Sequence, residues 1–82
     1  MQYAYLITRT DDDTDEDRRV MSRGTQTLAD DQDPREFATA RLEQNCVEHS
    51  YYTGPRRIAY WPHQNDRPIP RTAPANAQHL DG

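Results

Sequence analysis

An acidic run near the amino end is the first place where residue types and spacing could support chemistry. Six of the seven residues from 11 to 17 are acidic, and three alternate aspartates match the first ligand positions of an EF-hand calcium loop. The match then fails, because Glu16 stands where the loop needs glycine and Ser22 where it needs a bidentate glutamate. Carboxylates can also imitate a DNA backbone, but only in regular spacing on a rigid surface. The sequence favours a solvated acidic loop over residues 10–18.

The only cysteine and a nearby histidine form a second candidate site. Cys46 and His49 have the spacing of two metal ligands, or of a nucleophile and its base. A structural zinc site needs four ligands, usually with paired cysteines, and no oxyanion-hole turn accompanies the pair. The sequence therefore predicts no catalytic residue, no metal site and no cofactor. Because a lone cysteine forms no internal disulfide, it also predicts a reducing, cytoplasmic location.

Arginines next to aromatic residues form the third candidate. Arg56 and Arg57 precede Tyr60 and Trp61, and such a set can hold phosphate groups and stack on bases. Against nucleic acid stand the net charge of −4 and the absence of an RNA-binding motif. Tyr, Trp and Arg also dominate the binding energy of protein interfaces. The sequence therefore predicts a protein-binding surface made of Tyr3, Tyr5, Arg56, Arg57, Tyr60 and Trp61.

Composition limits the size of the core. The chain has 82 residues, of which 33% are hydrophobic, so it forms one domain with a thin core. A second subunit often completes such a core, which predicts a homodimer. No apolar run is long enough to cross a membrane. All ten basic residues are arginine, and this bias predicts a high-GC bacterial genome, or a phage or plasmid within one.

Three strands and one helix are expected to position these residues. Alternating aromatic and branched residues predict strands at 2–9 and 56–61, and residues 18–28 predict a second strand antiparallel to the first. Asp33 is suited to cap a helix that begins with Pro34 and carries Glu36 in its first turn. This helix should run to about residue 46. Its predicted inner face holds Phe37, Ala38, Leu42 and Cys46, with Arg41 at the edge.

The carboxyl-terminal residues differ in composition from the rest of the chain. Residues 63–82 contain three prolines and only two large apolar residues, Ile69 and Leu80, which predicts a disordered tail. The expected fold is a β-β-α-β domain over residues 1–62, with a three-stranded sheet and one helix on a face. The expected function is that of a non-enzymatic protein-binding or accessory module, and the alternative is a nucleic-acid-associated regulatory factor.

Overall fold

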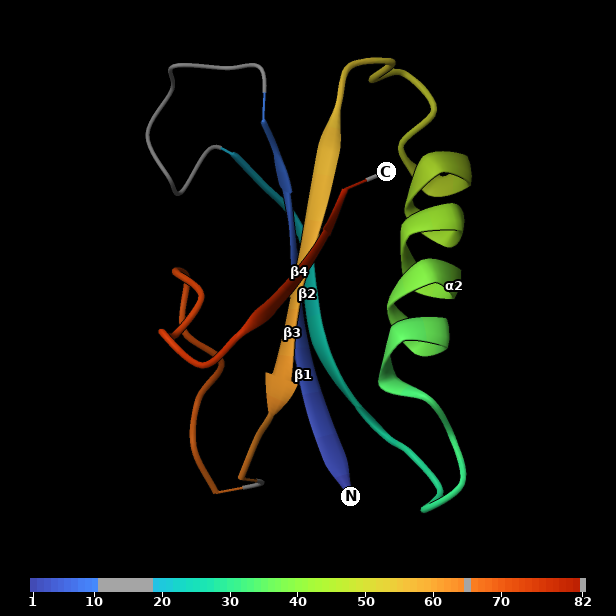
Figure 1. Cartoon of the computed structure of the whole chain (residues 1–82). Helices are drawn as coiled ribbons and strands as arrows, with labels where there is room; N and C mark the ends of the chain where they lie inside the picture. The colour runs from blue at the N-terminus through green and yellow to red at the C-terminus, as the bar shows by residue number, and fades with distance from the viewer. Residues whose placement is uncertain (11–18, 65, 82) are drawn as a thin grey trace.

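The computed structural model describes residues 1–10, 19–64 and 66–81 of the chain. It is an α+β fold in which one long helix lies against an antiparallel four-stranded sheet of order β2-β1-β3-β4 (Figure 1). The elements are β1 (Gln2–Arg9), β2 (Val20–Thr27), α2 (Pro34–Glu48), β3 (Arg56–Pro62) and β4 (Gln78–Asp81). Among the described residues, no helix is long and apolar enough to span a membrane.

The first strand lies inside the sheet, as its sequence predicts. β1 pairs with β2 on one side and with β3 on the other, and Ala4 to Ile7 are all buried. Side chains of alternate residues point to opposite faces of a sheet. Tyr5 and Ile7 therefore belong to the cluster beneath the helix, and Ala4 and Leu6 to a separate cluster on the other face.

Local signals in the sequence define α2. Asp33 caps the helix, since its carboxylate accepts a hydrogen bond from the backbone N–H of Arg35 at 3.0 Å. The helix buries Phe37 and Leu42 against the sheet. Phe37 meets Tyr5 edge to face, with ring centroids 5.9 Å apart. The helix extends two residues beyond the predicted end at 46, and Cys46 is exposed rather than inward-facing.

The prediction of three strands is wrong, because the sheet has four. Gln78–Asp81 pair antiparallel with β3 inside the segment that composition assigned to a disordered tail. Ile69, Ala73 and Ala77 of the same segment pack on the second face of the sheet. We call residues 66–77 the strap; in Figure 1 it lies on the side of the sheet away from α2. The apolar residues of the strap are dispersed among polar ones without a period that predicts a helix or a strand, so the sequence gives no signal of their packing.

Gly24 lies within β2, at a point where the pairing with β1 is regular. It pairs with Tyr5, and a Cβ added at Gly24 would stand 2.8 Å from the Tyr5 hydroxyl oxygen. The irregularity in the β1–β2 ladder lies instead between Ile7 and Thr8, where the register shifts. Glycine at position 24 thus makes room for a ring that also packs on Phe37.

A buried arginine, Arg56, links the end of α2 to the loop that follows the helix. Arg56 is 4% exposed, and its guanidinium donates to the Asn45 side chain and to the Tyr52 carbonyl. It also lies 5.2 Å from the centroid of the Tyr52 ring. Burying a guanidinium is costly unless its donors are satisfied, and these contacts satisfy two of its nitrogens. Arg56 therefore holds the end of α2 and the start of β3 together.

Candidate binding site

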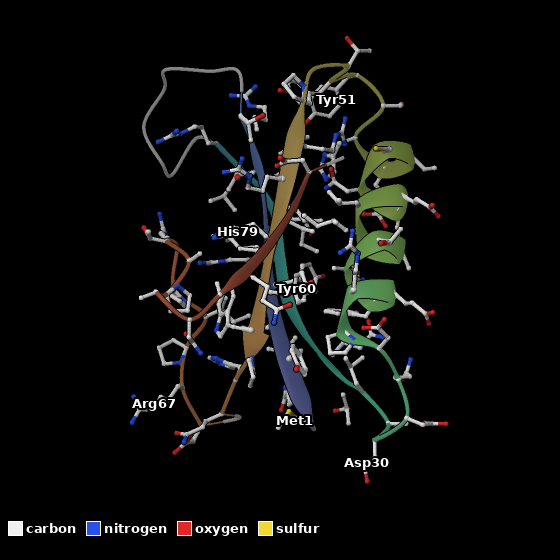
Figure 2. All side chains as sticks on the ribbon, in the orientation of Figure 1. Met1, Asp30, Tyr51, Tyr60, Arg67 and His79 are labelled. Atoms are coloured by element: carbon white, nitrogen blue, oxygen red, sulfur yellow. The ribbon has the colours of Figure 1, made fainter. Side chains whose placement is uncertain are left out.

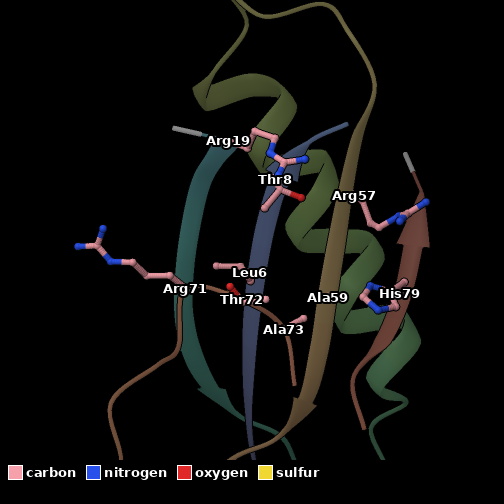
Figure 3. A pocket seen from close by; sticks show the side chains of 9 residues that line it. All are labelled: Leu6, Thr8, Arg19, Arg57, Ala59, Arg71, Thr72, Ala73 and His79. Atoms are coloured by element: carbon pink, nitrogen blue, oxygen red, sulfur yellow. The ribbon is translucent and has the colours of Figure 1, made fainter. Parts of the chain in front are cut away.

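One hollow of the described surface lies on the sheet face opposite α2. It has a volume of about 180 Å³, which is below the roughly 300–1,000 Å³ of pockets for drug-sized ligands. Strands β1, β3 and β4, the strap and Arg19 form its walls (Figure 3). Its lining residues are Leu6, Thr8, Arg19, Arg57, Ala59, Arg71, Thr72, Ala73 and His79. The volume suits a single side chain or a small anion.

The floor of this cavity is apolar and its rim is polar. Leu6 and Ala59 are 3% and 5% exposed, and they face the strap across the sheet surface. His79 pairs with Ala59 across the β3–β4 ladder, which places its ring on the same face as the cavity (Figure 3). Three arginines and a histidine contribute to the lining, and no carboxylate among the described residues does. The cavity therefore attracts anions.

Arg57 is already engaged at the edge of the sheet. Its Nε atom lies 2.6 Å from Oδ1 of Asp81 on the neighbouring strand. This hydrogen bond lowers the pKa of Asp81 below its ordinary value and raises the pKa of Arg57. In Figure 3 the Arg57 side chain turns toward β4, and that of Arg71 extends the other way, past β2. Neither guanidinium points into the hollow.

Arg19 is the cation best placed for a ligand. Its Nε atom is buried and donates to no residue that the structure describes. In Figure 3 its side chain lies directly above Thr8, at the upper end of the cavity. A buried donor without an acceptor costs about 1–3 kcal/mol, and more when it is charged. Arg19, Thr8 and His79 are thus the polar side chains of the lining that an anion in the cavity could contact.

Charge is distributed unevenly between the two sides of the sheet. The helix and the turn before it, residues 30–48, carry six acidic residues and two arginines. The opposite side carries Arg19, Arg23, Arg57 and Arg71, since Arg23 pairs with Leu6 and so shares its face. Asp81 forms an ion pair with Arg57 there. The arginine-bearing face, as we call this side, is therefore the part that favours an acidic partner.

The residues that the sequence nominated as a binding surface do not form one patch. Tyr5 and Tyr60 are 7% and 4% exposed beneath α2, and Arg56 is buried beside them. Trp61 is buried on the opposite face. Tyr3 is half-buried and packs against Phe37, which leaves Arg57 as the only exposed member. The helix covers the face on which tyrosines were expected to meet a partner.

The groups that surround the cavity were missed because they come from distant parts of the chain. Arg19 directly precedes β2, Arg71 belongs to the strap, and His79 lies in β4. Arg71 and His79 both lie in the segment whose composition predicts a disordered tail. The available signal was the contrast between an acidic helix region and the dispersed arginines around it.

The other sequence candidates gain no support as sites. Cys46 is exposed on α2, and Nδ1 of His49 lies 3.2 Å from the Tyr51 hydroxyl. Tyr51, 79% exposed, stands at the end of the molecule opposite Met1 (Figure 2). Within the described ranges, no three His, Cys, Asp or Glu side chains are grouped as metal ligands would be. The acidic run at 11–17 lies outside the described residues.

Comparison with protein families, curated proteins and solved structures finds no match to this chain. What the site does must therefore be inferred from its own geometry.

Proposed function

We propose that the chain is a protein-binding module whose arginine-bearing face receives an acidic side chain of a partner protein. The observation that carries this proposal is the cavity beside Arg19, which combines an apolar floor with a cationic side chain whose buried Nε–H has no acceptor among the described residues. A carboxylate on a short aliphatic stem has matching chemistry: its methylenes contact Leu6 and Ala59, and its oxygens accept from Arg19. Bonds between guanidinium and carboxylate are charge-assisted and about twice as strong as neutral ones.

Cavity size and overall charge favour a protein over a nucleic acid as the partner. A nucleic acid brings a continuous line of phosphates, which needs a long basic track. Here the helix side is acidic and the net charge is −4. Trp61 is 4% exposed and cannot stack on a base in this fold. A protein offers single carboxylates on an otherwise neutral surface, which suits one small cavity.

NMR titration of the full chain tests this proposal directly. The probes are a glutamate-rich peptide, the same peptide with glutamine in place of glutamate, and a single-stranded oligonucleotide. We expect the glutamate peptide alone to shift the Nε–H resonance of Arg19 and the backbone amides of Thr8 and His79. Binding should weaken as salt is added, because the contact is partly ionic.

Two matched variants separate the cavity from general electrostatics. Arg19→Gln and Arg23→Gln remove the same charge from the same face, but only Arg19 lines the cavity. We expect Arg19→Gln to weaken peptide binding roughly tenfold, as loss of a charge-assisted bond predicts, and Arg23→Gln to change it little. Equal effects of the two variants, or tighter binding of the oligonucleotide, would overturn the proposal.

A further inference from the structure

The outer edge of β2 is the longest unpaired strand edge that the structure describes. β2 has eight residues and pairs only with β1, whereas the opposite edge strand, β4, has four. No other described segment forms a backbone hydrogen bond with β2 apart from its partner strand and the Met1–Leu28 pair beside it. The contacts of α2 are mainly with β3, β1 and β4. Arg41 of α2 donates to the Gln26 side chain of β2, but no described segment pairs with the outer backbone edge of β2.

The hydrogen-bond pattern identifies which backbone groups are free. Met1 and Leu28 exchange two bonds, at 2.8 Å and 2.9 Å, so they form a hydrogen-bonded pair. In an antiparallel ladder such pairs alternate with pairs that do not bond to each other. From the register, Gly24 bonds to β1, whereas the N–H and C=O groups of Arg23 and Thr25 point away from the sheet. Both residues are exposed.

Natural proteins usually protect such an edge with proline, lysine, inward charges or a covering segment. β2 contains no proline and one charged residue, Arg23. Its one protective feature is the register shift near Val20, at the strand's beginning. From residue 22 onward the pairing with β1 is regular, and a strand of matching length can add to it.

We propose that β2 pairs antiparallel with β2 of a second copy of this chain, around a two-fold axis at Gly24. This register overlaps residues 21–27 of the two copies and sets Arg23 of each copy opposite Thr25 of the other. An axis at Arg23 would place two arginines face to face, which is unfavourable. Arg23 is the only charged residue of β2, so the chosen register brings no like charges together. Each copy presents the same edge, and in this register the edge is complementary to itself.

The proposed two-fold axis also determines how the two arginine-bearing faces are oriented. A two-fold axis perpendicular to the sheet keeps equivalent faces on the same side. Both arginine-bearing faces would then belong to one continuous eight-stranded sheet and point in one direction. A partner with two acidic groups could engage both, which raises its effective affinity without new contacts.

Sedimentation and amide exchange of the full chain test the pairing. We expect the mass to rise from 9.6 kDa to twice that value with concentration. Over the same range, the amides of Arg23 and Thr25 should become protected, while those of Gly24 and Gln26 stay protected throughout because they bond to β1. This alternating pattern of amide protection can be measured on the unmodified chain.

Substitution of one outward-facing residue gives the second test. Thr25→Pro removes an N–H that β1 does not use, and edge strands tolerate proline; Thr25→Val keeps the donor and serves as the control. We expect Thr25→Pro to weaken dimerisation by at least roughly tenfold and Thr25→Val to leave it unchanged. A monomer at millimolar concentration, a dimer without added protection at residues 23 and 25, or protection caused only by another protein would overturn the proposal. None of these results would alter peptide binding at Arg19.

Discussion

The two faces of the sheet are closed in different ways. On one face, α2 contributes Phe37 and Leu42 to a cluster that includes Tyr5, Ile7 and Ile58, all at most 7% exposed. On the other face, the irregular strap contributes Ile69 and alanines that are only partly buried. The hollow on the helix side lies between α2 and β2 and is bordered by Asp33 and Glu36. The cavity of about 180 Å³ on the strap side lies over Leu6 and Ala59 and is lined by no described carboxylate.

This difference follows from the geometry of the covering segments. A helix presents large side chains at regular intervals along one stripe, and these can fill the surface of a sheet. The strap has no such period, and its alanines are too short to fill the space above Leu6. One face of the same sheet therefore supplies most of the stability, and the other supplies the space and charge on which the proposed binding rests. Three substitutions and one truncation test this division, from the largest expected effect to the smallest.

Phe37→Ala should cause the largest loss, because it empties the centre of the helix-side cluster. Phe37 is 5% exposed and contacts the rings of Tyr3 and Tyr5. Truncation of a buried phenylalanine costs about 3–5 kcal/mol, measurable by urea denaturation followed by circular dichroism. Phe37→Leu is the control and should cost far less. A loss below about 1 kcal/mol for Phe37→Ala would contradict the assignment of this face as the main core.

Truncation after Pro62 should cost less and affect mainly the other face. It removes Ile69, which packs on the strap side, and Leu80, which packs from β4 against the helix-side cluster. Their partial burial contributes about 2–4 kcal/mol in total. Trp61, the only tryptophan, is buried in the strap-side cluster, so its fluorescence should shift to longer wavelength while the helical signal remains. Ile69→Ala should give a smaller shift of the same kind. Unchanged emission after truncation would mean that the strap does not cover this face.

Gly24→Ala should destabilise the chain by about 1–2 kcal/mol, because the added methyl group overpacks the Tyr5 ring. The nearest atom is the Tyr5 hydroxyl oxygen at 2.8 Å. In a Tyr5→Phe background the cost should therefore fall, and a double-mutant cycle measures the difference. Thr25→Ala, one residue further on the opposite face, is the control. Equal costs in both backgrounds would show that the hydroxyl is not the obstacle.

Asp81→Asn should have the smallest effect, since its ion pair with Arg57 is exposed. The pKa of Asp81 is lowered in the folded chain. The ion pair therefore stabilises the fold at a pH above the ordinary pKa of 3.8, and this stabilisation is lost as the pH falls through the lower pKa of the folded chain. The difference in stability between wild type and variant should therefore shrink as the pH falls below that ordinary value, and disappear once Asp81 is protonated in the folded chain. A difference that grew on acidification would have the wrong sign for this ion pair.

The sequence predicted the helix-side half of the fold well. The cap at Asp33, the proline after it and the spacing of Phe37 and Leu42 are local signals, and they act within a few residues of each other. The predicted strand at 2–9 is likewise present as β1, and its alternation places Tyr5 and Leu6 on opposite faces. The predicted binding residues failed to form one patch, because alternation does not say which face a helix covers.

Sequence alone determined the α+β class, the position of the helix and the antiparallel pairing of the first two strands, since neighbouring residues set propensity, capping and alternation. Tertiary structure alone decided that the proline-containing end forms β4 and a strap, and that Arg19 and His79 border one cavity. The physical reason is distance along the chain: the strap is ordered by contacts with β1 and β3, whose residues lie far from it in sequence. Composition measures how apolar a segment is, and it does not record the apolar surface that the rest of the fold offers to it.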